Sequence, residues 1–95
     1  MSKKGAGSMF KSKTDAGKNN LCGEQVYRIR KAKSPKMSQR ALAEKLQLCG
    51  MDVDKNAIQR IECGKRFVTD IELVALSRAL NVSISELLLL PENEK

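Results

Sequence analysis

Histidine and tryptophan are absent from this sequence of 95 residues, and phenylalanine and tyrosine together occur only three times. Without histidine, the commonest general base and a frequent metal ligand are missing. No serine or cysteine has an evident base beside it in the sequence, and no glycine-rich phosphate loop is present. We therefore expect neither catalysis nor a bound cofactor or metal.

The scarcity of aromatic residues also bears on nucleic-acid binding. Proteins that bind single strands stack the bases on aromatic side chains, and Phe10, Tyr27 and Phe67 are too few for such a platform. Duplex DNA that is read by polar side chains fits this composition better.

The cysteines, Cys22, Cys49 and Cys63, are odd in number, widely spaced and unaccompanied by histidine. Neither a disulfide framework nor a four-ligand zinc site can be assembled from them within one chain, so we interpret them as reduced thiols. No apolar run approaches the roughly 20 residues that span a bilayer, and the N-terminus lacks the apolar segment of a signal peptide. We expect a soluble, cytoplasmic protein with no membrane partner.

What the sequence does contain is positive charge. Lysine and arginine number 18 against 11 aspartates and glutamates, which gives a net charge of +7 and a sequence pI near 9.6. Residues 1–20 carry +4, residues 21–66 carry +6 and residues 67–95 carry −3. This balance favours a polyanionic partner that binds the first two thirds of the chain.

A chain of this length makes one small domain. Residues 1–20 mix glycine, serine, lysine and asparagine with no hydrophobic period, so they are predicted to be a disordered basic tail. Gly7-Ser8 just before Met9 is typical of a cloning scar. The alternative, a basic arm of the kind that some DNA-binding proteins place in the minor groove, stays open. We expect the folded domain over residues 21–90 and a second tail at 91–95.

The spacing of apolar residues predicts helices and no strand. The first helix is expected over residues 21–33, where Ser34-Pro35 ends it. Ser38 and Asp54 are placed to cap a second and a third helix, and Gly50 marks the break between them. The side chains expected to be buried by these helices are Cys22, Val26, Ile29, Leu42, Ala43, Leu46, Val53, Ile58 and Ile61.

Two further helices each open with a capping box, formed by Thr69 with Glu72 and by Ser83 with Glu86. Pro91 is expected to end the last helix. Apolar residues fall on several sides of the fourth helix, so we expect it to be buried from more than one direction. The apolar residues of the fourth helix are Ile71, Leu73, Val74, Leu76 and Leu80. Those that line the fifth helix are Ile84, Leu87 and Leu88. The predicted fold class is all-α, a five-helix bundle.

The third helix has a polar outer side. On a helical wheel at 100° per residue, the core side centres on Ile58 and Ile61. Asparagine and glutamine can pair bidentately with adenine, and arginine and lysine with guanine. Any surface helix turns polar residues outward, however, so a plain solvated helix is the alternative at this point. The outer side carries Asn56, Gln59, Arg60 and Cys63, with Lys55 toward its flank.

An ordered set of motifs favours the DNA-reading interpretation. The chain contains Gln39-x-x-Leu42-Ala43, Ile58-x-Arg60-Ile61-Glu62-x-Gly64-Lys65-Arg66, Leu76-x-x-Ala79-Leu80-Asn81-Val82 and Glu86-Leu87-Leu88, in that order. Over about residues 21–90 this combination resembles the Cro/C1-type (XRE) helix-turn-helix family of phage and bacterial repressors. It is more specific than any single piece, and it implies a lambda-repressor-like DNA-binding domain.

The resemblance also implies roles for individual residues. Positions early in the third helix reach base edges, which fall on Lys55, Asn56, Gln59 and Arg60. The first residue of the second helix holds a phosphate, and the turn after the third helix follows the DNA backbone. The residues expected to contact phosphates are Gln39, Arg40, Lys65 and Arg66, with Gly64 opening the turn.

The family pairs an arginine of the first helix with the glutamate that ends the recognition helix, and Arg30 and Glu62 match this pattern. Glu62 lies beside Ile58 on the wheel, at the edge of the buried stripe, where an unpaired carboxylate would be costly. We therefore expect a structural ion pair that orients the third helix.

Three features depart from the family. The connection at residues 47–53 is several residues longer than the usual turn, and Pro35-Lys36 lengthens the link before the second helix. The longer connection can change the angle between the second and third helices. Cys63 stands where the family commonly has a polar residue, and we favour an inert thiol over a redox sensor.

The predicted function is sequence-specific binding of double-stranded DNA by a transcriptional regulator, a repressor that occupies an operator. One recognition helix covers few base pairs, so we expect a homodimer with its readers spaced roughly 34 Å apart. Leu89 and Leu90 are the suspected dimer contacts, and a frayed C-terminus is the alternative. The alternative function is an antitoxin that binds a toxin protein and represses its own operon.

Overall fold

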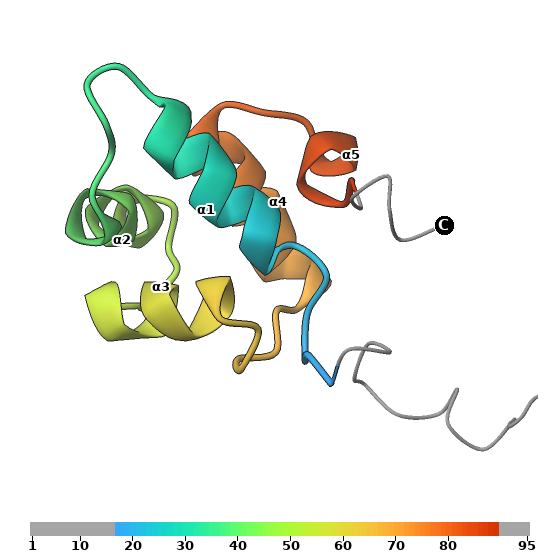
Figure 1. Cartoon of the computed structure of the whole chain (residues 1–95). Helices are drawn as coiled ribbons and strands as arrows, with labels where there is room; N and C mark the ends of the chain where they lie inside the picture. The colour runs from blue at the N-terminus through green and yellow to red at the C-terminus, as the bar shows by residue number, and fades with distance from the viewer. Residues whose placement is uncertain (1–16, 90–95) are drawn as a thin grey trace, which may run out of the picture.

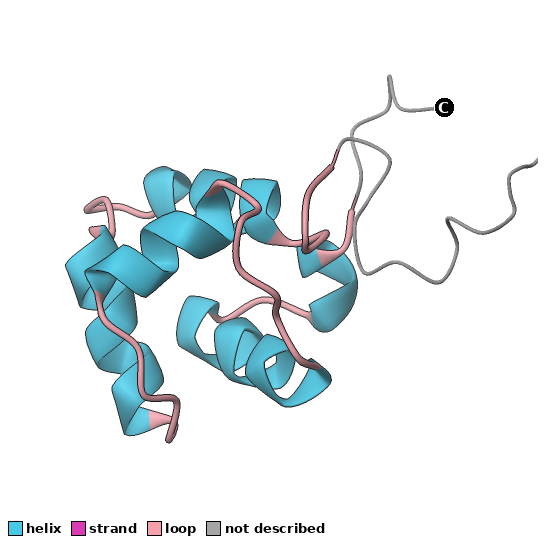
Figure 2. Ribbon diagram, turned by 90° about the horizontal axis from the view of Figure 1, so that it is seen from below, coloured by secondary structure: helices cyan, strands magenta, loops and turns pink. Residues whose placement is uncertain are grey.

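Five helices build the part of the protein that the computed structural model describes, residues 17–89. They are α1 (Gly23–Ala32), α2 (Gln39–Leu48), α3 (Lys55–Glu62), α4 (Asp70–Leu80) and α5 (Ile84–Leu87). α1 and α4 cross the middle of the molecule, with α2 and α3 on one side and α5 on the other (Figure 1). Within these residues there are only helices and connecting loops (Figure 2), which confirms the predicted all-α class.

Helices α2 to α5 begin where short polar side chains predict them to begin. Ser38 accepts a hydrogen bond from the backbone N–H of Ala41 at 3.0 Å, and Asp54 accepts one from Ala57 at 2.9 Å. At the start of α4, the hydroxyl of Thr69 accepts the N–H of Glu72, whose carboxylate accepts the N–H of Thr69 in return. Each cap satisfies N–H groups that have no partner within the helix.

The core lies where the first four helices meet. Val26 of α1, Leu46 of α2, Ile61 of α3 and Leu76 of α4 have no solvent-exposed surface, and burying a side chain of this size stabilises a fold by about 1.5–3 kcal/mol. All but one of the side chains predicted to be buried by the first three helices are buried; the exception is Ile29, which is partly exposed and packs against the same cluster.

One side of α4 is open to solvent. Leu76 and Leu80 are fully buried, but Ile71 is 78% exposed and Val74 is 36% exposed. The expectation that Ile71 and Val74 are buried on further sides of α4 is therefore wrong. The helices that pack against it, α1, α2 and α5, leave the side with Ile71 and Val74 uncovered.

α5 is shorter and less covered than its leucines predict. It ends at Leu87, which is fully buried, whereas Ile84 and Leu88 are each 38% exposed. Ser83 accepts the N–H of Glu86 at 3.1 Å, but only α4 has the complete capping box among the helices described. The predicted end at Pro91 and the suspected contact at Leu90 lie outside the described residues.

The long connection between α2 and α3 is packed rather than looped out. Met51 and Val53 are buried, and the backbone N–H of Met51 donates to the carbonyl of Leu46 at 2.9 Å. The side-chain amide of Gln47 donates to the carbonyl of Val53 at 2.7 Å. These contacts make the added residues part of the core wall.

The chain just before α1 also belongs to the fold. Asn20 Nδ2 donates to the carbonyls of Ile61 at 3.1 Å and Arg66 at 2.7 Å, and Asn20 Oδ1 accepts the N–H of Gly23 at 2.8 Å. Gly23 lies so close to α3 that a Cβ at this position would collide with the carbonyl oxygen of Ile61. The prediction that the tail extends to residue 20 is therefore wrong, and residues 1–16 lie outside the described part.

Candidate nucleic-acid interface

The outer side of α3 presents a continuous polar surface. Ala57, Ile58 and Ile61 are buried beneath it, and the side chains on the outer side span an arc of about 140° on a helical wheel. Asp54 is the N-cap of this helix, and its side chain accepts the backbone N–H of Ala57. The exposed residues are Lys55, Asn56, Gln59, Arg60 and Cys63. All four predicted base-reading residues thus lie on one accessible surface.

A buried ion pair holds the far end of α3. Arg30 Nε donates to Glu62 Oε2 at 2.7 Å, and Arg30 Nη2 donates to Glu62 Oε1 at 3.0 Å. The two side chains are 9% and 6% exposed. The remaining guanidinium nitrogen, Nη1, donates to the carbonyl of Met37 at 2.9 Å. Bidentate geometry and the extra hydrogen bond offset the cost of removing both charges from water.

Gln39, the first residue of α2, joins this pair. Its side-chain Nε2 donates to Glu62 Oε1 at 2.9 Å, a contact that the sequence did not indicate. One carboxylate therefore fixes α1, α2 and α3 relative to one another. An amide nitrogen carries two hydrogens, so the second hydrogen of Gln39 Nε2 remains for the predicted phosphate contact.

The two predicted phosphate contacts in the turn after α3, Lys65 and Arg66, have different surroundings. Lys65 is exposed to solvent, whereas Arg66 binds Glu72 of α4 through Nη1 at 3.0 Å and Nη2 at 3.2 Å. The Arg66 guanidinium lowers the pKa of the Glu72 carboxyl. Arg66 is thus tied to the protein, and Lys65 is the residue of this turn that extends outward. Arg40 of α2 is also exposed.

Three residues that bind the turn after α3 could not be recognised as its partners from the sequence. The sequence identifies Glu72 only as a capping residue, and Asn19 and Asn20 fall within the predicted tail. All three bind the turn at residues 64–66 through contacts that are distant in sequence or unrelated to helix periodicity. A short polar segment has no periodic pattern of residues, so its hydrogen-bond partners elsewhere in the chain could not be predicted from the sequence.

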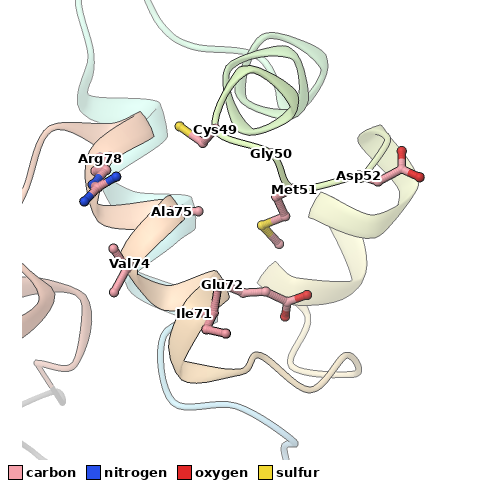
Figure 3. A pocket seen from close by; sticks show the side chains of 9 residues that line it. All are labelled: Cys49, Gly50, Met51, Asp52, Ile71, Glu72, Val74, Ala75 and Arg78. Carbon is pink, nitrogen blue, oxygen red and sulfur yellow. The ribbon is translucent and has the colours of Figure 1, made fainter.

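The thiols differ in accessibility. Cys22 is buried, and this burial raises the pKa of its thiol to about 11, whereas Cys49 and Cys63 are exposed. Cys63 ends the polar surface of α3. Cys49 lines a groove between the α2–α3 connection and α4, with Met51 and Ala75 also at its wall (Figure 3). One exposed thiol therefore marks the outer side of α3 and the other marks a different surface.

The described residues contain no group of three or more side chains suited to hold a metal ion. Across residues 17–89, no helix has both the length and the apolar character needed to cross a membrane.

Replacing Glu62 by alanine is expected to lower the free energy of unfolding by about 3–5 kcal/mol, because it leaves the Arg30 guanidinium buried without its partner. Thermal and urea unfolding followed by circular dichroism measures this change. Glu44→Ala, at an exposed position of α2, is the control and should unfold as the natural chain does. Equal stability of the two variants would contradict a structural role for the pair.

Comparison with known proteins gives the same architecture. A helix-turn-helix family model matches residues 26–87. The P22 c2 repressor, solved in complex with synthetic operator 9T in the presence of Tl+, is 32% identical with a TM-score of 0.58, covering 73% of this chain and 94% of that chain. The restriction-modification controller protein C.AhdI from Aeromonas hydrophila is 24% identical with a TM-score of 0.59, covering 70% and 91%. A search of curated proteins finds no match.

The matched residues contain α2, α3 and the polar surface described above. Proteins of this family are DNA-binding regulators rather than enzymes. On the family match and on the identity with the P22 c2 repressor, the chain belongs to the Cro/C1-type helix-turn-helix family of transcriptional regulators.

Proposed function

We propose that this regulator recognises a specific double-stranded DNA operator and represses transcription by occupying it. The observation that carries the proposal is the outer side of α3, where four exposed side chains able to pair with bases lie on a helix whose far end is fixed by a buried carboxylate. A fixed helix presents these groups to the major groove in one register, which sequence discrimination requires.

The proposed roles follow from side-chain chemistry and exposure. Asn56 and Gln59 offer an amide donor and acceptor to adenine, and Arg60 and Lys55 offer donors to guanine. Lys65 and Arg40 contact phosphates as exposed cations. Gln39 contributes its remaining amide N–H from the start of α2. Arg66 contributes more weakly, because its guanidinium is bound to Glu72.

We further propose that the protein binds DNA as a homodimer and acts in the cytoplasm. A single α3 covers only a few base pairs, and two copies spaced one turn of DNA apart, roughly 34 Å, multiply the specificity. The apolar side chains left open at α5, namely Ile84, Leu88 and Leu89, support a contact between two copies. The free state of all three thiols fits a reducing compartment. The P22 c2 repressor, with its operator complex, supports the repressor role.

Selection of bound duplexes from a random DNA pool at about 150 mM salt tests this function, because at that ionic strength non-specific binding to phosphates is weakened. We expect one enriched sequence arranged as an inverted repeat, with half-sites spaced by a turn of the duplex. Binding without enrichment would contradict operator recognition, and enrichment of a single half-site would contradict the dimer.

Asn56→Ala and Arg60→Ala are expected to relax the preference at particular base positions, each costing about 1–3 kcal/mol of discrimination. Lys65→Ala should instead weaken binding to every duplex alike and reduce the slope of log affinity against log salt by about 1. Titration of each variant against the selected duplex and its single-base changes measures both effects. If all three variants weakened every duplex equally, the base-reading assignment would be wrong.

Alkylation of the thiols gives an independent test of which surface meets DNA. Saturating operator is expected to slow the reaction of Cys63 with iodoacetamide and to leave Cys49 unchanged, because Cys63 lies on the outer side of α3 and Cys49 lines the groove beside α4. Cys22 should stay unmodified in both states, since it is buried with a pKa of about 11. Mass spectrometry resolves the three sites. Protection of Cys49 with Cys63 still reactive would place the DNA on the other surface.

A further inference from the structure

The segment before α1 runs along the turn that follows α3 (Figure 1). Three successive carbonyls of this turn each accept a hydrogen bond from an N–H group of the segment before α1. The backbone N–H of Asn19 donates to Gly64 at 2.7 Å, Asn19 Nδ2 donates to Lys65 at 2.9 Å, and Asn20 Nδ2 donates to Arg66 at 2.7 Å. We call these two asparagines the asparagine clamp.

The asparagine clamp also ties the turn to both helices beside it. Asn20 Nδ2 makes a second hydrogen bond, to the carbonyl of Ile61 in the last turn of α3, and Asn20 Oδ1 accepts the N–H of Gly23 at the start of α1. A single amide thus uses both its donors and its acceptor to link α1, α3 and the turn.

Hydrogen bonds hold the backbone of the turn on both sides of Lys65. Gly64 has φ +80°, a conformation that side chains disfavour, and a Cβ there would meet the side chain of Lys18. The N–H of Lys65 donates to the carbonyl of Arg60 at 2.8 Å. With its N–H bound to α3 and its carbonyl bound to Asn19, Lys65 has its backbone fixed on both sides while its side chain is exposed.

We propose that Asn19 and Asn20 are positioning residues for DNA binding, which hold Lys65 at a set place relative to the bases read by α3. The proposal rests on the proposed function, because it needs Lys65 to meet a phosphate. A lysine on a loosely held turn would lose conformational freedom on binding and give up part of the contact's free energy. Because the asparagine clamp already restricts the backbone of Lys65 in the free protein, less conformational freedom is lost when DNA binds.

A double-mutant cycle with Lys65 separates positioning from general stabilisation. Asn20→Ala is expected to weaken binding to the selected operator by up to about tenfold, as the loss of one ordinary hydrogen-bonded contact would. It should also lower the salt slope by up to about 0.9, the share of one phosphate. Base preference at each position should stay as in the natural chain. In the Lys65→Ala background, the same change should alter affinity and salt slope little.

Gln25→Ala is the matched control. Its amide donates to the carbonyl of Glu86 at 3.0 Å and so joins α1 to α5, away from the turn. It removes the same kind of bond, and its effect on binding should be equal with and without Lys65. Circular dichroism at the assay temperature confirms that each variant is folded.

Equal weakening by Asn20→Ala in both backgrounds would overturn the positioning role. If Asn20→Ala does not fold, Asn19→Ala carries the same cycle, since it removes only the side-chain bond to the Lys65 carbonyl and keeps the backbone bond to Gly64. If the natural chain selects no sequence from the random pool, the proposed function fails instead. The two failures are therefore distinguishable.

Discussion

The arrangement of the first three helices depends on the carboxylate of Glu62. It accepts hydrogen bonds from Arg30 of α1 and from Gln39 of α2 while belonging to α3. Removing such charged groups from water costs several kcal/mol per ion, and that cost is offset only when all three helices are docked together. Partial or shifted packing leaves a buried charge without a partner. The network thus favours one arrangement of α2 and α3, and the direction of the outer side of α3 follows from it.

This constraint explains how the chain accommodates a long connection between α2 and α3. The end of α3 is held by Glu62, and its start is held by the Asp54 cap and the apolar residues beneath. Met51 and Val53 pack into the core wall, so the added residues contribute buried surface. Residues of this connection also line the groove beside α4 in Figure 3, with Gly50 at φ +89° where the chain turns. The orientation of α3 is therefore set by its two ends rather than by the length of the connection.

Local features of this structure could be predicted from the sequence, and long-range polar contacts could not. Ser38, Asp54 and Thr69 act within three residues of themselves, so spacing alone identified them. The outer side of α3 followed from helix periodicity in the same way. The amides of Gln39 and Asn20 can donate or accept in any direction, and which carbonyl or carboxylate they meet depends on the packing of distant helices. The prediction that Ile71 and Val74 are buried was wrong, because an apolar side chain is buried only where another element covers it.

The asparagine clamp lies before the region that the helix-turn-helix family model matches. That region spans residues 26–87, whereas the buried Cys22, the close approach of Gly23 and both asparagines precede it. A fragment excised at the bounds of similarity would leave the carbonyls of Gly64, Lys65 and Arg66 without these donors and would open the core at the start of α1. Transferring this DNA-binding domain to another protein therefore requires that residues 19–25 be included with it.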